Sequence, residues 1–221
     1  LFRSSMELFT SYREIATDQS KAGKVMRTIL MRLGSEVYEQ ICLAAASADE
    51  DRGTAIYYVL HRAFGGGRCE KRVMEALADP YVSRVAKMAL CVKREYHHYF
   101  GFVRFREIGG RFLLAKIQPG NDILSLMALH FSNRFPNENW VIYDEKRQKA
   151  LCHEKGKACV MRKGVRIQVP GSAVGDMGEY EELWQTFCDS ISIEARRNEK
   201  LQKQMLALHF RSNMPEFSVK G

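Results

Sequence analysis

Hydrophobic residues recur every three or four positions along the first hundred residues, which is the periodicity of helices that each bury one face. The stretch 17–33, for example, has Val25, Ile29 and Leu33 four residues apart. Glycines and a proline fall at the predicted helix ends, where these residue types stop or begin helices. Four more helices are predicted from the same repeat, over residues 35–47, 51–64, 69–79 and 80–100.

The pattern changes after residue 100. In residues 102–117 hydrophobic and basic side chains alternate around a Gly-Gly pair, and such a pair between two strands is typical of a β-hairpin. Residues 121–135 show the helical repeat again. Residues 139–162 have the composition of two or three short strands joined by polar turns, and a long helix is predicted over 179–210.

These elements predict an α+β protein with a helical N-terminal half, a small central antiparallel sheet and a long C-terminal helix. The change of pattern divides the chain into a helical subdomain, residues 1–100, and an α+β subdomain, residues 101–221, packed as one domain. A length of 221 residues with 46% hydrophobic content is sufficient for one such core.

Targeting and cysteine content indicate the cellular compartment. No hydrophobic run is long enough to span a membrane, and the N-terminal residues lack the apolar segment and cleavage site of a signal peptide. The six cysteines include no closely spaced pair, which argues against a structural zinc site or an iron–sulfur cluster. We therefore expect a cytoplasmic protein with reduced thiols and no metal or other cofactor. Because the chain begins at Leu1, we also expect that further residues precede it.

The formal net charge of +8 indicates an anionic partner, most commonly nucleic acid. Between Arg84 and Lys116 lie eight basic residues and two acidic ones, a net of +6, with aromatic residues among them. Arginine beside exposed aromatic side chains suits phosphates and unstacked bases. The alternative is that the aromatic residues fill the core and the basic ones form a solvated surface. The predicted nucleic-acid-binding residues are Lys93, Arg94, Arg104, Arg106, Arg111, Arg134 and Arg147.

The candidates for acid–base catalysis lie in or near these basic stretches. His130 and Arg134 are four residues apart on a predicted helix, so both would project from one face. No HExxH pattern is present, and a metal ion bound by His97 or His98 would need distant partners, so no metal site is predicted. Each candidate also has a structural explanation, because helical histidines commonly pack against neighbours and aspartates commonly cap turns. The candidates are Glu95, His97, His130 and Asp144.

Several motifs match one family over nearly the whole chain. In order, they are TDQSKAGKV, EYHHYFGFVRF, PGNDILSLMALHFSNRFPNENWVIYDEKRQKA, YEELWQTFCDSISIEARRNEKLQKQ and HFRSNMPEF. In these motifs the chain resembles a bacterial family of uncharacterised DNA-metabolism or DNA-repair proteins. At His98 the family often has arginine instead. The matching positions are Glu95, His97, Gly101, Phe102, Arg104, Phe105, Asp122, His130, Arg134, Asp144 and Arg147.

The resemblance implies a domain that acts in DNA repair or modification. Members of the family are typically encoded beside a radical SAM protein, and in some relatives the domain is fused to a uracil-DNA-glycosylase-like domain. Family chains usually begin some tens of residues before the position of Leu1. The resemblance supplies no reaction, so it assigns no catalytic residue.

Three functions remain open at this point. The first is a nucleic-acid-binding accessory protein that holds DNA through the basic region 84–116 and acts with a radical SAM partner. The second is an enzyme acting on nucleic acid or a nucleobase, which requires the acid–base candidates to converge in one pocket. The third is a protein–protein adaptor without nucleic-acid contact, which predicts an exposed apolar patch.

Overall fold

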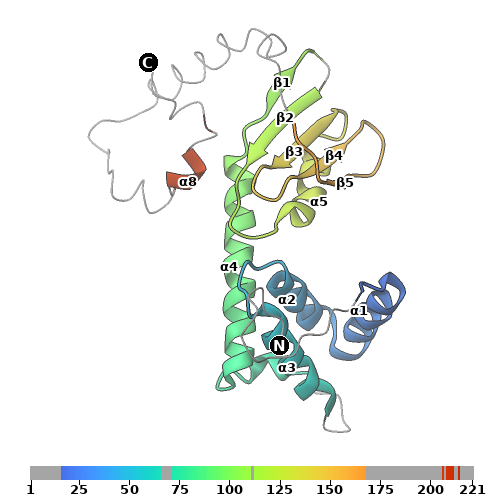
Figure 1. Cartoon of the computed structure of the whole chain (residues 1–221), viewed down its shortest axis with the longest axis vertical. Coiled ribbons are helices and arrows are strands. Elements are labelled where there is room, and N and C mark those ends of the chain that lie inside the picture. The colour runs from blue at the N-terminus through green and yellow to red at the C-terminus, as the bar shows by residue number, and fades with distance from the viewer. Residues whose placement is uncertain are drawn as a thin grey trace, which may run out of the picture. The chain divides into compact units, whose positions relative to one another are not determined.

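The computed structural model describes residues 16–65, 71–110, 112–167, 206, 208–211 and 214. Over these residues the protein is α+β, with five helices, α1 to α5, a five-stranded mixed sheet and a single-turn helix, α8 (Figure 1). The described residues form two compact units: the helical unit, up to Glu95 with Gly120–Asp122, and the sheet unit, Tyr96–Pro119 with residues from Ile123 onward. No helix in this part of the chain has the length and apolar character to cross a membrane.

The helical unit consists of α1 (Gln19–Leu33), α2 (Ser35–Ala45), α3 (Arg52–Gly65), the 3₁₀ turn η1 (Val73–Glu75) and the N-terminal part of α4 (Pro80–Phe102). Helices α2 and α3 lie beside that part of α4, and α1 packs against α2 (Figure 1). The buried side chains recur at the predicted helical spacing, because each helix turns one apolar face toward the common core. They include Ile29, Leu33, Val37, Ile41, Ala55, Val59, Ala63, Val82, Val85 and Met88.

Polar side chains and glycine set the helix ends in this unit. The Asp18 carboxylate accepts a hydrogen bond from the backbone N–H of Lys21 at 3.0 Å and caps α1. The Asp79 carboxylate accepts one from the backbone N–H of Tyr81 at 2.8 Å and caps α4 in the same way. Gly34, with a φ of 94°, separates α1 from α2 in a backbone conformation that favours glycine.

The helix predicted over residues 69–79 is wrong for its described part, residues 71–79. Only the short turn η1 forms there. Val73 and Met74 are buried although they are adjacent, whereas Leu77 is 60% exposed, so the residues do not present one helical apolar face.

The sheet unit contains the C-terminal end of α4, the strands β1 (Arg106–Ile108), β2 (Phe112–Ile117), β3 (Trp140–Asp144), β4 (Lys149–His153) and β5 (Val160–Lys163), and α5 (Leu124–Arg134). The strands lie side by side in chain order. The pairs β1–β2, β3–β4 and β4–β5 are antiparallel, but β2–β3 is parallel. The predicted antiparallel sheet is therefore wrong at one pair, because α5 is a crossover that makes β3 run in the same direction as β2.

The β1–β2 hairpin confirms the prediction made from the glycine pair. Gly109 and Gly110 have φ angles of 59° and 63°, a backbone conformation that favours glycine, and Ile108 lies opposite Phe112 where the two strands pair. The strand predicted to begin at residue 102 starts later, because α4 continues to Phe102.

Helix α5 lies against one face of the sheet (Figure 1), and aromatic side chains pack between them. Phe131 lies on α5, and its ring centroid is 6.2 Å from that of Trp140 on β3 and 5.5 Å from that of Phe105. On the opposite face, Tyr143 is buried, and its hydroxyl donates a hydrogen bond to the carbonyl of Val165 at 3.0 Å. The core of this unit therefore has both sheet faces occupied near the centre of the sheet.

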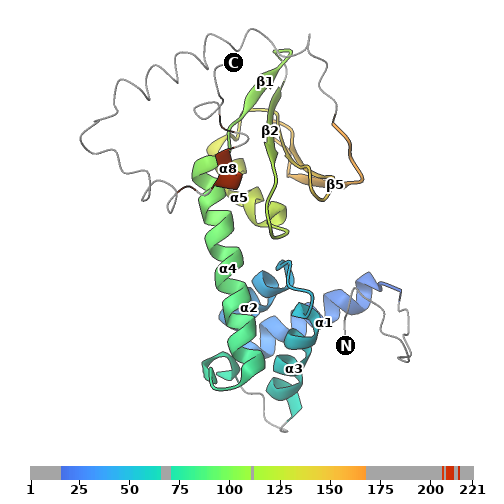
Figure 2. The same ribbon diagram turned by 60° about the vertical axis from the view of Figure 1, so that its left-hand side comes forward.

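The long helix predicted over residues 179–210 lies almost wholly outside the described residues, which include only Leu206 and part of α8 (Leu208–Arg211) there. Figure 2 shows α8 beside the C-terminal end of α4. Phe210 is buried against Tyr99 and Phe102, with ring centroids 4.8 and 5.2 Å apart. Tyr99 itself is only 4% exposed, so its ring belongs to the core and is not available to stack on a base.

Candidate functional site

The exposed basic side chains of α4 in the helical unit are the first part of the predicted nucleic-acid surface. Lys87, Lys93 and Arg94 are exposed. The Lys93 ammonium lies 3.5 Å from the Glu39 carboxylate, but both side chains are more than half exposed, so water weakens this pair. These three cations therefore retain most of their capacity to bind an anion.

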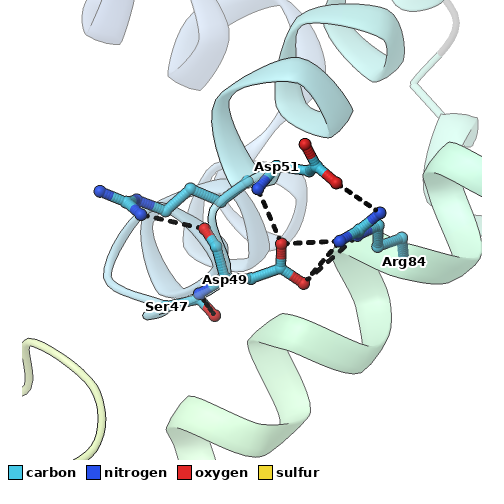
Figure 3. A network of polar contacts seen from close by, with 5 residues as sticks. Ser47, Asp49, Asp51 and Arg84 are labelled. Carbon is cyan, nitrogen blue, oxygen red and sulfur yellow. Dashed lines mark hydrogen bonds and ion pairs between the residues drawn. The ribbon is translucent and has the colours of Figure 1, made fainter. Parts of the chain in front are cut away.

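Arg84 belongs to the same basic stretch but has acidic partners (Figure 3). Its Nη2 donates hydrogen bonds to both carboxylate oxygens of Asp49, at 2.8 and 3.0 Å, and its Nη1 lies 3.1 Å from the Asp51 carboxylate. Burial alone would raise the pKa of Asp49, but the hydrogen bonds from Arg84 and from the Asp51 backbone N–H hold it below its ordinary value. Arg84 therefore joins the α2–α3 connection to α4.

Glu95, an acid–base candidate, accepts three hydrogen bonds from the segment 120–122. The donors are the backbone N–H of Gly120 at 2.6 Å, the backbone N–H of Asn121 at 2.9 Å and the Asn121 side-chain amide at 2.6 Å. The side-chain oxygen Oδ1 of Asn121 in turn accepts a hydrogen bond from the backbone N–H of Ala48 at 2.9 Å. A Cβ atom on Gly120 would lie 3.3 Å from the Glu95 carboxylate, so a larger residue there would crowd this contact. These contacts give Glu95 a structural role.

His97 and His130 both lie against Phe100. The His130 ring stacks on the Phe100 ring with centroids 3.9 Å apart at an interplanar angle of 10°, and the His97 ring meets Phe100 edge-on at 6.1 Å. Nε2 of His130 is buried and has no hydrogen-bond partner in the described part of the chain. Burial, the positive charge of Arg134 and the nearby His97 lower the pKa of His130, so the imidazole is mainly neutral at pH 7.

The arginines predicted to bind nucleic acid in the sheet unit differ in their surroundings. Arg134 is exposed at the end of α5, and its guanidinium lies 5.6 Å from the ring of the next residue. Arg104 donates a hydrogen bond to the carbonyl of Gly101 at 2.8 Å, which satisfies an acceptor at the end of α4. Arg106 is exposed at the start of β1, and Arg111 lies outside the described residues.

Asp144 and Arg147 form a turn at the end of β3. The Asp144 carboxylate is fully buried, and it accepts from the Arg147 backbone N–H and from the Arg147 guanidinium, both at 3.1 Å. The guanidinium also donates to the carbonyl of Pro119 at 2.9 Å. Only 19% of the Arg147 side chain is exposed. The pair therefore closes the turn, as the structural explanation of Asp144 predicts.

The four acid–base candidates thus have three different environments in the described residues. His97 and His130 share Phe100, whereas Glu95 binds the 120–122 segment and Asp144 binds Arg147. Among the described residues, no group of three or more His, Cys, Asp or Glu side chains is arranged to hold a metal ion.

The prediction from sequence included only Arg147 from the most basic part of the chain. Residues 146–167 contain eight Lys and Arg residues against one acidic residue, Glu154, a net of +7. These residues form the β4–β5 hairpin and the segments beside it. The basic residues can be counted in the sequence, but the hydrophobic residues of two strands separate them from one another. The stretch before position 116 contains both aromatic and basic residues, and this combination favoured it as the predicted binding region.

The exposed apolar residues of α1 are a second feature of the helical unit. Their side chains are exposed to between 42% and 82%, although such residues are usually buried in a monomeric domain. They are Val25, Met26, Leu30 and Met31. The adaptor hypothesis predicts a surface of this kind.

Comparison with known protein families gives a match that covers most of the chain. A family model described as a domain of unknown function, DUF4130, matches residues 50–216. The match includes α3 to α5 and all five strands, and therefore all four acid–base candidates. No curated protein and no solved structure matches the chain.

Proposed function

The chain belongs to the DUF4130 family, a domain of unknown function, and we propose that it is a nucleic-acid-binding accessory protein in DNA repair or modification. The distribution of charge carries the proposal. In the described residues, the sheet unit up to residue 167 has twelve Lys and Arg against five Asp and Glu, a net of +7. The helical unit has twelve against ten, a net of +2. A local excess of this size attracts a polyanion, because neutralised phosphates release their counterions.

Not every predicted basic residue contributes to this binding. Arg84 and Arg147 hold acidic side chains within the fold, so their charges are balanced locally. Lys93, Arg94, Arg106 and Arg134 have exposed side chains and remain candidates for phosphate contacts.

Binding is tested with labelled single-stranded and double-stranded oligonucleotides followed by fluorescence anisotropy over a series of salt concentrations. We expect log K to fall linearly with log salt, with a slope of about −0.9 for each phosphate neutralised on a duplex. The absence of binding at low salt, or binding that salt does not weaken, would refute the proposal.

The family resemblance adds a radical SAM protein, or a uracil-DNA-glycosylase-like domain, as the partner that supplies the chemistry. The exposed apolar side chains of α1 are suited to such a protein contact, because exposed methionine and aliphatic residues pack readily against another protein. Co-purification of the two proteins, with and without nuclease treatment, tests this part. Association that survives nuclease and is lost in Met31→Glu supports a direct contact, whereas association lost with nuclease alone contradicts it.

A second candidate function is a nucleic-acid-processing enzyme, and the His97–His130 pair favours it. A neutral histidine with an unpartnered ring nitrogen, close to an exposed histidine and to Arg134, has the groups needed to move a proton near a phosphate. This candidate predicts that His97→Ala and His130→Phe abolish turnover of an oligonucleotide substrate while binding persists. Turnover that survives both substitutions would exclude it.

A further inference from the structure

Most cations of the β4–β5 hairpin have no acidic partner among the described residues. Of the eight basic residues in 146–167, Arg147 is held by Asp144, and the Lys157 ammonium lies 2.7 Å from the Glu154 carboxylate. For Lys146, Lys155, Arg162, Lys163 and Arg166, no acidic partner is present in the described part of the chain, and all five are exposed. The hairpin therefore presents a concentrated positive field to solvent.

The register of the hairpin places two lysines directly opposite each other. Lys149 on β4 pairs with Lys163 on β5, and Ala150 pairs with Arg162 beside them. Directly opposite residues in an antiparallel pair have Cβ atoms about 5 Å apart, and like charges at that separation destabilise the sheet. A phosphate that approaches this end of β5 would be attracted by the exposed Arg162 and Lys163, which follow each other on the strand.

The strand β5 lies at the edge of the described sheet, which makes these cations accessible from both sides. Side chains alternate along a strand, so Arg162 points to one face and Lys163 to the other. Arg166 follows the strand, beyond the turn at Gly164, which has a φ of 68°. Cations on both faces of the edge strand can contact successive phosphates of a nucleic-acid backbone that runs along the strand.

The kind of nucleic acid follows from what the hairpin lacks. Residues 146–167 contain no Phe, Tyr or Trp, and the one histidine, His153, is buried with its ring stacked on Trp140. Single-stranded nucleic acid is bound largely by stacking of its bases on aromatic side chains. A surface of cations without aromatic residues suits instead the phosphates of a duplex, whose bases remain stacked on one another.

We infer that the β4–β5 hairpin is the surface that binds the phosphate backbone of double-stranded DNA. This inference rests on the proposed nucleic-acid-binding function and moves its main contacts from the region 84–116 to the edge of the sheet. An alternative explanation is that charges on an edge strand only prevent pairing with other chains. That role requires a few charges of either sign and gives no reason for five exposed side chains of the same sign.

Two variants that each lose three positive charges test whether the binding surface is the hairpin or α4. One is Arg162→Ala/Lys163→Ala/Arg166→Ala in the hairpin, and the other is Lys87→Ala/Lys93→Ala/Arg94→Ala on α4. Duplex binding is measured by anisotropy from about 50 to 200 mM salt. We expect the hairpin variant to lose roughly tenfold or more in affinity and its salt slope to fall by about 2 to 3, close to 1 for each side chain removed. The α4 variant should change both quantities much less.

The outcomes distinguish this inference from the function on which it rests. If the wild-type protein binds no nucleic acid, the proposed function fails. If the wild type binds but the hairpin variant keeps its affinity and slope, or if both variants lose equally, the location is wrong. A preference for single strands over the duplex of the same length would overturn the choice of ligand.

A single substitution guards against a folding artefact. Lys163→Glu places a carboxylate opposite Lys149, so it should raise the thermal midpoint while it weakens duplex binding. Duplex affinity equal to that of the wild type in this folded variant would overturn the inference. A surface that serves only to protect the edge predicts higher stability with unchanged binding.

Discussion

Replacement of Glu95 should destabilise the helical unit strongly, although the side chain is only half-buried. Its carboxylate accepts three hydrogen bonds, two of them from Asn121, which is 8% exposed. In Glu95→Ala the backbone N–H and the side-chain amide of Asn121 lose their charged acceptor, and water reaches them poorly. A buried donor without a partner costs about 1–3 kcal/mol. Two such donors give a loss of about 3 kcal/mol.

Glu95→Gln is the sharper test, because the side chain keeps its shape. The glutamine oxygen can accept from one side, but its amide group then faces a second N–H donor. We expect a loss of about 1–2 kcal/mol, from one missing bond to a charged group. The matched control is Glu50→Gln, since Glu50 is an exposed glutamate in the same unit and should change stability by less than about 0.5 kcal/mol.

The assay is urea unfolding followed by circular dichroism. The change in the free energy of unfolding is taken from the shift in the urea midpoint, with the same m-value for variant and wild type. A double-mutant cycle with Asn121→Ala adds specificity, because partners in one network should show a coupling energy of about 1 kcal/mol or more. The reasoning is refuted if Glu95→Gln destabilises no more than Glu50→Gln, or if the cycle gives additive changes.

Three further predictions concern other polar contacts. Arg84→Met should reduce stability by about 1 kcal/mol at pH 7. Arg84 keeps the folded-state pKa of Asp49 below its ordinary value. The stabilisation that this pair provides is therefore present above about pH 4 and is lost as the pH falls through the lower pKa. The thermal midpoint of the variant should for this reason drop less on acidification than that of the wild type. Asp144→Ala should cost about 3 kcal/mol or more in chemical unfolding, because it leaves the largely buried Arg147 without its counterion; a loss below 1 kcal/mol would contradict this. Because the pKa of His130 is lowered in the folded state, the contribution of its neutral ring to stability is complete above about pH 6.5 and decreases below it. His130→Phe retains an aromatic stack on Phe100 but does not titrate. The thermal midpoint of this variant should therefore fall less between about pH 7 and pH 5 than that of the wild type.

Local patterns predicted the elements whose signals are contained within a few residues. The helical repeat identified α1 to α5 because each buries one face, and the glycine pair identified the β1–β2 turn because only that pair readily adopts two consecutive positive φ angles. The direction of β3 could not be obtained in this way. It depends on where α5 returns the chain, and a strand has the same alternation of side chains whether its neighbour is parallel or antiparallel.

The roles of the candidate residues were less predictable, because each depends on a partner far away in sequence. The partner of Arg84 is Asp49, 35 positions earlier, and the Glu95 carboxylate binds residues 25 and 26 positions later. No motif spans these separations. Sequence reasoning correctly gave the alternatives for Asp144, but only the burial of both members of its pair favours the structural one.

The distribution of charge shows why a net value along a sequence window is a weak guide to a binding surface. The window from Arg84 to Lys116 has a net charge of +6, yet Arg84 is paired with Asp49 and Asp51, and the Lys116 ammonium lies 3.7 Å from the Glu145 carboxylate; these acids all lie outside the window. Within the described residues, the window 146–167 keeps five exposed cations without an acidic partner, whereas Asp144 pairs with Arg147 and Glu154 with Lys157. A polyanion is attracted mainly by the cations that have no acidic partner within the protein. By that criterion the β4–β5 edge, rather than α4, is where substitution should first weaken duplex binding.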